Sequence, residues 1–280
     1  MNRRWVWVAA AVCLGAVFDQ VAAQTPGDGA SSAAGPVSAP RFARPAGYLG
    51  PDGIPEHELF LPAPPANDSP LGVADFQVFR ATRSLEGTPR WELAAHDAEI
   101  GSAAVLRDFG CALGVDLSEA ETPKLSRLIG RASADLFPII GDAKAFYQRP
   151  RPFVTETGPV CVTVSEQFAA SGSYPSGHAA TGWLYALLLT EIAPDRSAEL
   201  LARGRTYGES RVVCGVHFVS DVEAGRLATS AIVAAMSGNA EFQADLAAAR
   251  EEVDALRAEG GAKPAAGQCS AEQAGATRPW

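Results

Sequence analysis

Apolar residues recur at helical spacing along most of the chain from about Leu71 onward. Residues three and four positions apart lie on one face of a helix, so this spacing predicts amphipathic helices packed on a common core. Two short helical stretches are predicted at 75–79 and 91–95, separated by a Gly-Thr-Pro breaker. Longer helices are predicted at 97–112, 118–136, 138–147, 177–192, 195–211, 218–236 and 239–258. No run alternates apolar and polar residues as a strand would, so we expect an all-α fold in a single helical domain.

One of these helices carries its own start signal. Ser118 and Glu121 have the spacing of a capping box, in which each side chain accepts a hydrogen bond from the other residue's backbone N–H. This pattern places the start of the 118–136 helix at Ser118, although Pro123 could delay the first turn.

The first 23 residues have the pattern of an export signal. Arg3 and Arg4 precede an apolar run that ends near Phe18, and small residues follow at 21–23. The run is shorter than the roughly 18–20 residues that span a bilayer, which disfavours a membrane anchor. We therefore expect residues 1–23 to be removed as a signal peptide. The mature protein would then be periplasmic or secreted and would make no membrane contact.

The composition of the remaining chain predicts three regions. Residues 24–45 are rich in Ala, Gly, Pro and Ser and predict a disordered leader. Residues 46–262 hold the helical pattern and form the expected domain, in which the Pro-rich stretch 51–70 would wrap the helices as extended chain. The composition of residues 263–280 predicts a loose C-terminal tail, which Cys269 could attach to the domain.

Charge and cysteine content narrow the class of protein. The net charge of -9 argues against a nucleic-acid partner, which would require a basic surface. Removal of the signal peptide would leave four cysteines of the five, namely Cys111, Cys161, Cys214 and Cys269. In an exported protein they could form up to two disulfides in three possible pairings, and four free thiols remain the alternative.

The first candidate motif places two cations near the end of a predicted helix. Lys144 and Arg151 are seven positions apart, but Pro150 and Pro152 forbid a helix across both. We expect the helix to end near Gln148 and Arg151 to be held by a stiff Pro-x-Pro segment. An immobilised arginine suits bidentate binding of an oxyanion.

The second motif lies at the start of the apolar helix 177–192. Ser176 is a suitable N-cap, and Gly177 would let a ligand approach the backbone. The free N–H groups and the positive end of the helix dipole favour an anion at this position. His178, in the first helical turn, would then face that anion.

The third motif pairs a histidine with an aspartate. His217 and Asp221 are four positions apart, which would make them neighbours on one helix face. The aspartate could then fix the imidazole tautomer and leave the other ring nitrogen free as a nucleophile. Arg211 would add a third cation from the preceding helix.

Taken together, the three motifs resemble the signature of the type 2 phosphatidic acid phosphatase (PAP2) superfamily, which also includes vanadium haloperoxidases. Within it the chain is most similar to the bacterial class A non-specific acid phosphatases over about residues 59–250. That similarity includes the segments 61–65, 87–91 and 172–174 and the signal peptide. The resemblance implies an all-α fold with the helical core of this superfamily and a phosphohistidine mechanism without a metal or cofactor.

The resemblance also implies a role for each motif residue. We expect His217 to attack phosphorus, Asp221 to orient it, and His178 to protonate the leaving alcohol and then activate water. The residues expected to bind the phosphoryl oxygens are Lys144, Arg151, Arg211, Ser176 and Gly177. The substrates would be small-molecule phosphate monoesters, with phosphate transfer to other alcohols as a side activity.

Two other functions would use the same residues. A vanadate-dependent haloperoxidase would hold vanadate permanently in the same cradle, by which we mean the predicted set of oxyanion-binding residues. A non-catalytic phosphate-binding protein would need the cations but not the two histidines. The sequence also leaves open whether the chain forms a homo-oligomer.

Overall fold

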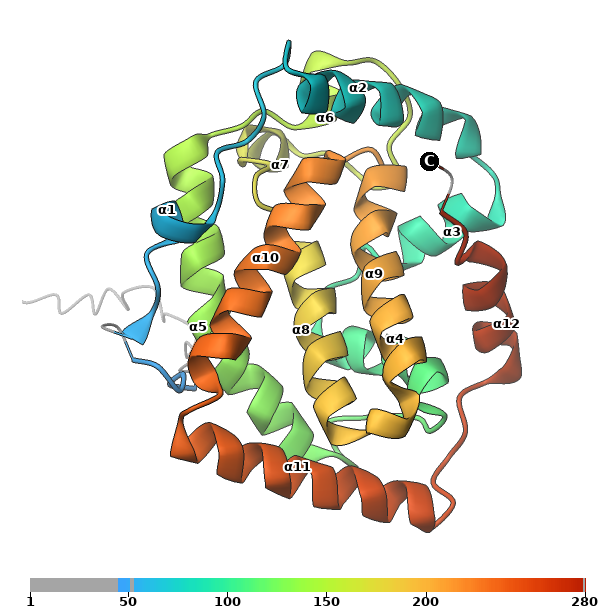
Figure 1. The fold of residues 1–280 in the computed structure, drawn as a ribbon. Helices are drawn as coiled ribbons and strands as arrows, with labels where there is room; N and C mark the ends of the chain where they lie inside the picture. Colours follow the sequence, from blue (N-terminus) through green and yellow to red (C-terminus); the bar gives the residue numbers. More distant parts are fainter. Residues whose placement is uncertain (1–44, 51–52, 279) are drawn as a thin grey trace, which may run out of the picture. The chain divides into compact units, whose positions relative to one another are not determined.

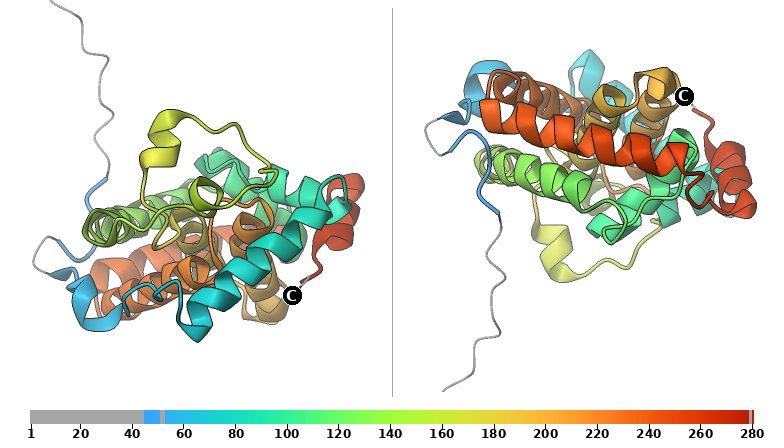
Figure 2. Two further views of the ribbon diagram at one scale, coloured as in Figure 1. Left: turned by 90° about the horizontal axis from the view of Figure 1, so that it is seen from above. Right: turned by 90° about the horizontal axis from the view of Figure 1, so that it is seen from below.

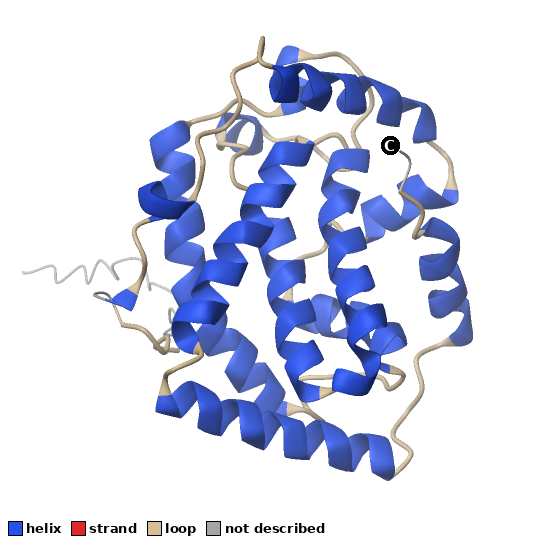
Figure 3. Cartoon of the chain, viewed as in Figure 1, coloured by secondary structure: helices blue, strands red, loops and turns tan. Residues whose placement is uncertain are grey.

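The computed structural model describes residues 45–50, 53–278 and 280, which consist of helices and loops without a strand (Figure 3). The all-α prediction is therefore confirmed for this part of the chain. The predicted signal peptide at 1–23 and the predicted leader at 24–45, except Pro45, lie outside the described residues. None of the described helices is both long and apolar enough to cross a bilayer.

Three helices form the centre of the domain, each running in the opposite direction to the one before it in sequence (Figure 1). These are α8 (Gly177–Ile192), α9 (Ser197–Val213) and α10 (Val219–Met236). Most residues of α8 are buried, and the helix also contacts α5 (Pro123–Tyr147) and α11 (Ala240–Ala258). A helix enclosed on so many sides needs an apolar sequence all round, which explains why 177–192 shows no polar stripe.

Small residues allow α8 and α9 to approach closely. A Cβ atom at Gly204 would lie 2.4 Å from the Cβ of Ala186, and one at Gly182 would lie 2.5 Å from the ring of Tyr207. These distances are far below van der Waals contact, so neither position tolerates a side chain without a shift of the helices.

The α5 helix differs from the sequence prediction at two points. It is continuous across Pro138, where two helices were predicted, because the residues around the proline remain buried in the core. It also begins at Pro123 rather than Ser118, whose hydroxyl accepts from the Glu121 N–H in a preceding turn. Proline is favoured at a first helical position because its missing N–H would have no partner there. Seen from below, α5 lies beside α11 (Figure 2).

Shorter helices surround this core. The first is α1 (His57–Phe60), within the Pro-rich segment. It is followed by α2 (Pro70–Thr82), the 3-10 turn η2 (Arg83–Leu85), α3 (Pro89–His96) and α4 (Ser102–Leu113). Two short helices, α6 (Pro152–Thr155) and α7 (Glu166–Ala170), lie between α5 and α8, and the turn η3 (Pro194–Arg196) precedes α9.

The C-terminal segment is not the loose tail that its composition predicts. It contains α12 (Ala266–Gly275), which packs on α3, and Cys269 forms a disulfide with Cys111 of α4. A second disulfide joins Cys161 to Cys214, so one of the three possible pairings is present and the free-thiol alternative is wrong. The prediction of looseness failed because a short, Ala-rich segment gives little sign of a helix that depends on a distant cysteine.

Candidate active site

The three sequence motifs meet at the end of the bundle where α5 ends and α8 and α10 begin (Figure 1). Backbone hydrogen bonds join them directly. The Ser176 N–H donates to the Asp221 carbonyl at 2.9 Å, and Ser173 N–H donates to the Arg149 carbonyl at 2.9 Å. Arg151 Nη1 donates to the Val216 carbonyl at 3.0 Å. Segments more than 60 residues apart in sequence are therefore held in one site.

His217 is a buried imidazole with both ring nitrogens engaged. Its Nδ1 lies 3.3 Å from Asp221 Oδ2, and its Nε2 lies 3.1 Å from Arg151 Nη1. Because a guanidinium only donates and a carboxylate only accepts, Nδ1 carries the proton and Nε2 presents its lone pair. Burial, followed by the charges of nearby cations led by Arg151, holds the pKa of His217 well below its usual value. The imidazole is therefore neutral, which a nucleophile requires.

The contact between His217 and Asp221 arises differently from the prediction. The two residues do not share a helix face, because α10 begins only at Val219 and His217 precedes its N-cap, Phe218. Asp221 instead occupies the third helical position and accepts from the Phe218 N–H at 2.8 Å. The same carboxylate oxygen then reaches back to His217, so a helix-capping aspartate also orients the imidazole.

Lys144 and Arg151 are both held by backbone carbonyls of the 171–173 segment. Lys144 Nζ donates to the Gly172 carbonyl at 2.6 Å, and Arg151 Nε donates to the Ser171 carbonyl at 3.2 Å. The Arg151 guanidinium also stacks on Phe168, with its Cζ atom 4.1 Å from the ring centroid. Burial, together with the charge of Arg151, lowers the pKa of Lys144 to about 7.

Arg211 differs from the other cations because two of its nitrogens have no partner. The side chain is only 2% exposed, and neither Nε nor Nη1 makes a hydrogen bond within the described residues. Burial lowers its pKa to about 10, so it stays charged at neutral pH. An unpaired buried guanidinium is costly unless an anion binds there, which is consistent with the predicted role of Arg211 in oxyanion binding.

The start of α8 has the predicted capping geometry. Ser176 Oγ accepts from the Ala179 N–H at 3.3 Å, and the helix begins at Gly177. A Cβ atom at Gly177 would make only an ordinary contact with Ile140, at 3.7 Å, so packing within the protein does not require glycine there. At Gly225, by contrast, a Cβ would lie 2.4 Å from the Ser176 carbonyl oxygen, so α10 approaches this backbone closely.

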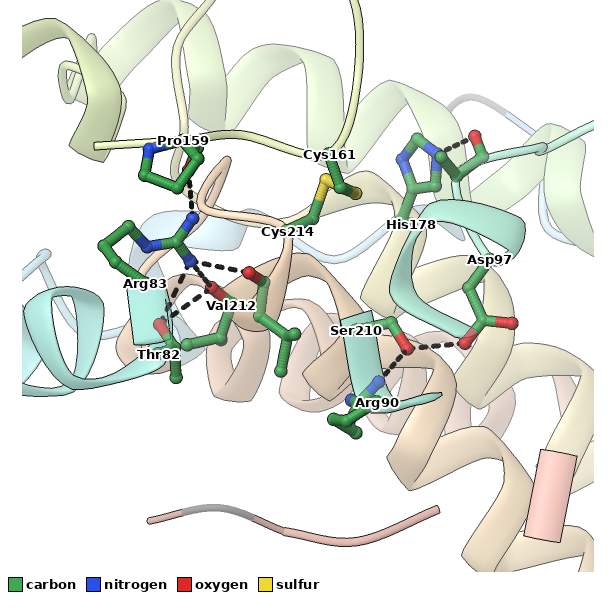
Figure 4. The surroundings of a disulfide bond; sticks show 12 residues. Thr82, Arg83, Arg90, Asp97, Pro159, Cys161, His178, Ser210, Val212 and Cys214 are labelled. Atoms are coloured by element: carbon green, nitrogen blue, oxygen red, sulfur yellow. Dashed lines mark hydrogen bonds between the residues drawn. A yellow bond between two sulfur atoms is a disulfide. The ribbon is translucent and has the colours of Figure 1, made fainter. Parts of the chain in front are cut away.

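His178 is fixed by a backbone carbonyl in the turn after α3. Its Nε2 lies 3.0 Å from the Ala98 carbonyl (Figure 4), so Nε2 carries the proton and Nδ1 is left for a ligand. Burial, followed by the charge of Arg211, lowers the pKa of His178 to about 3. Arg211 and Arg151 lower the pKa of both histidines, which places the two imidazoles around the same cations.

The turn that holds His178 is itself attached to α9. The carboxylate of Asp97 accepts from Ser210 Oγ at 2.5 Å (Figure 4). It also accepts from Arg203 Nη2 at 2.7 Å. Asp97 directly precedes Ala98, and Ser210 directly precedes Arg211. The position of the His178 acceptor is thus coupled to the helix that carries Arg211.

All eight predicted site residues lie in this region, but sequence reasoning missed the groups that hold them. These include the carbonyl of Ala98, the hydroxyl of Ser171, which accepts from Arg151 Nη2 at 3.1 Å, and Arg149, whose Nη1 donates to Asp221 Oδ1 at 2.7 Å. Only Arg149 had a signal, because it stands in the same Arg-Pro-Arg-Pro run as Arg151. Within the described ranges, no three His, Cys, Asp or Glu side chains cluster as metal ligands.

Comparison with known proteins identifies the family of this chain. Residues 129–241 match the model of the PAP2 superfamily. The chain is 44% identical over 200 residues to an acid phosphatase of Zymomonas mobilis, covering 71% of this chain and 76% of that protein. It is 36% identical over 199 residues to a non-specific acid phosphatase of Salmonella typhimurium and 38% identical over 199 residues to one of Providencia stuartii, each covering 70% of this chain and 80% of the relative. The chain therefore belongs to the PAP2 superfamily.

Proposed function

We propose that this chain is an exported acid phosphatase that hydrolyses small phosphate monoesters through a phosphohistidine at His217. Its acid phosphatase relatives support the reaction class. The observation that carries the proposal is the unpaired, buried guanidinium of Arg211 beside two histidines of fixed tautomer. A tetrahedral dianion would give Arg211, Arg151 and Lys144 the charge partner that the described residues do not supply.

In the first step, His217 Nε2 attacks phosphorus and the bond from phosphorus to the ester oxygen breaks. Arg151, which now donates to Nε2, would turn to a phosphoryl oxygen as the anion enters. His178 gives a proton to the departing alkoxide, which leaves as the alcohol. Asp221 stabilises the positive charge that develops on the imidazole when the phosphorus–nitrogen bond forms.

In the second step, the neutral His178 takes a proton from water, and the oxygen attacks phosphorus. The phosphorus–nitrogen bond breaks, and its electron pair returns to Nε2 of His217. The sum of the two steps is ester plus water to alcohol plus phosphate. Without ligand, burial and then the charge of Arg211 lower the pKa of His178 to about 3, so a bound dianion must offset the nearby cations before this residue acts as an acid.

Two features support export. The first 23 residues have the pattern of a signal peptide. The two disulfides, Cys111–Cys269 and Cys161–Cys214, are typical of proteins that fold in an oxidising compartment such as the periplasm.

The test is to trap the phosphoenzyme. The wild-type protein, mixed with a ³²P-labelled monoester and quenched within milliseconds, should carry label that is labile to acid and stable to base, as expected for phosphohistidine. His217→Ala should lose the label and at least about 1,000-fold in kcat, because no other group can form the intermediate. The matched control is His57→Ala, at the first residue of α1, which should leave both readouts unchanged. Label retained in His217→Ala would refute the proposal.

A further inference from the structure

Arg149 occupies a buried position between two carboxylates. Its Nη1 donates to Asp221 Oδ1 at 2.7 Å, and its Nη2 donates to Asp75 Oδ2 at 2.9 Å. The residue exposures are 7% for Arg149, 4% for Asp75 and 0% for Asp221. The three side chains come from the loop after α5, from α2 and from α10, so three separate segments contribute to one row of alternating charges.

Other groups fix this row in place. Arg149 Nη1 also donates to Ser220 Oγ at 2.7 Å, and the Ser220 N–H donates to Asp75 Oδ1 at 3.1 Å. The Ser220 hydroxyl donates to the other oxygen of Asp75. The guanidinium lies over the ring of Phe218, with Cζ 4.2 Å from the centroid. The Arg149 guanidinium therefore has a defined orientation, which it passes on to the Asp221 carboxylate.

Packing alone gives a weak reason for this arrangement. Removing three charges from water is costly, and apolar residues of similar size would often anchor α2 at least as well. The hydrogen bonds of the guanidinium run to Asp75, Asp221 and Ser220, while Arg151 is the arginine that contacts His217. The hydrogen bond to Asp221 is therefore the most direct link between the Arg149 guanidinium and His217.

The summed charge of Asp75, Arg149 and Asp221 suggests how Arg149 affects the reaction. Asp221 has to stabilise the cationic imidazole that forms when His217 is phosphorylated. A single arginine bonded to Asp221 would oppose this by cancelling its charge. Asp75 cancels the charge of the arginine instead, so the row keeps one net negative charge behind the imidazole.

We propose that Arg149 and Asp75 are positioning residues for the His217–Asp221 pair. Arg149 holds Oδ1 of Asp221 so that Oδ2 faces His217 Nδ1, and Asp75 neutralises Arg149 so that Asp221 retains its charge. This inference rests on the proposed nucleophilic role of His217, and it extends the catalytic apparatus to α2.

A double-mutant cycle tests the inference. Asp75→Asn leaves Arg149 uncompensated, so kcat and the rate of phosphoenzyme formation should fall roughly 10- to 100-fold. The inhibition constant of sulfate should change less than about threefold, because the residues expected to contact the anion are untouched. Adding Arg149→Gln restores the net charge of the row and should recover roughly fivefold or more of the lost kcat.

The matched control is another arginine with two acidic partners and an aromatic ring beneath it. Arg131 donates to Asp245 at 3.1 Å and to Glu241 at 2.6 Å, and its Cζ lies 4.0 Å from the Tyr48 ring centroid. The pair of changes Asp245→Asn and Arg131→Gln should lower thermal stability without changing kcat. Equal loss of kcat in this control would show that the Arg149 effect is merely structural and would overturn the inference.

Other results of these experiments would also contradict the positioning role. Additive losses of kcat in Asp75→Asn and Arg149→Gln, or a parallel weakening of sulfate binding, would overturn the inference. If Asp75→Asn fails to fold, Ser220→Ala provides the same test, with an expected loss of roughly threefold in kcat and unchanged sulfate binding; wild-type kcat there would count against it. A phosphoenzyme in His217→Ala would refute the proposed function itself, whereas wild-type kcat in Asp75→Asn would refute only the positioning role.

Discussion

The buried cations of the site differ in how the protein satisfies them. Lys144 donates to the carbonyls of Gly172 and Ser173, at 2.6 and 3.3 Å, whereas two nitrogens of Arg211 have no partner in the described part of the chain. Carbonyls satisfy hydrogen bonds but do not neutralise charge. Burial, with no carboxylate among the described residues paired to the amine, therefore lowers the pKa of Lys144 strongly, while Arg211 stays protonated although it is more deeply buried.

The pKa of Lys144, lowered to about 7, predicts how anion binding depends on pH. The amine is cationic below that pKa and neutral above it, so affinity should fall as pH rises. We expect the inhibition constant of sulfate, whose charge is constant in this range, to increase about tenfold from about pH 6 to about pH 8. In Lys144→Met the constant should already be high at the lower pH and should change less than about threefold. An equally steep increase in the variant would assign the titration to another group.

At the scale of the helices, the site depends on how closely α10 approaches the start of α8. The carbonyl oxygen of Ser176 lies 2.4 Å from the position that a Cβ of Gly225 would take, and the Ser176 N–H donates to the Asp221 carbonyl of α10. The proposed anion site at the α8 N-terminus and the pair formed by His217 and Asp221 are thus held together by a contact that only glycine permits.

Replacing this glycine should damage both stability and activity. Gly225→Ala places a methyl group against the Ser176 carbonyl, which should cost about 1–3 kcal/mol of unfolding free energy. It should also lower kcat at least roughly tenfold, because a shift of α8 moves Ser176 and His178 relative to His217. Gly238→Ala is the matched control, since a Cβ there meets no atom within 4 Å. Denaturant unfolding and steady-state kinetics measure the two effects, and wild-type kcat in Gly225→Ala would show that the contact is unimportant.

The helices differ in how far their local sequence predicts them. The helix at 177–192 was predicted to the residue, because Ser176 is a strong N-cap and an apolar run follows. The predicted break at Pro138 was wrong, because buried packing around the proline outweighs its local preference. The contact between His217 and Asp221 was predicted, but from a shared helix face rather than from the capping geometry that makes it.

At the scale of the whole molecule, the charge gathered in the site is opposite in sign to the net charge of the chain. The chain carries a net charge of -9, yet the interior of the site gathers Lys144, Arg151 and Arg211. Such a protein attracts anions only at short range, so substrate recognition depends on the cradle rather than on long-range steering.

The disulfide Cys111–Cys269 is expected to stabilise the whole domain. It closes a loop with a sequence separation of 158 residues and attaches α12, which packs on α3, to α4. Cys269→Ser should lower the unfolding free energy by about 2–5 kcal/mol and the melting temperature by about 5–15 °C. Activity at room temperature should remain within about twofold, because none of the predicted site residues lies on α4 or α12.

Ser270→Ala, on the same helix, serves as the control, because it removes only an exposed hydrogen bond to Ala266. Calorimetry on the two variants gives the comparison. Equal melting temperatures would mean that the disulfide does not stabilise the domain.

The sequence by itself determined the helical class, the eight candidate site residues and the family resemblance, because periodicity, capping residues and closely spaced motifs are local properties of a chain. Tertiary structure decided the rest: the cysteine pairing, the α12 helix, the tautomer of each histidine and the lowered pKa of Lys144. It also decided the contacts of Arg149 with Asp75 and Asp221, which lie 74 and 72 residues away in sequence. Burial and hydrogen bonding between distant segments set these properties, and no local pattern encodes which carbonyl or carboxylate a side chain will meet.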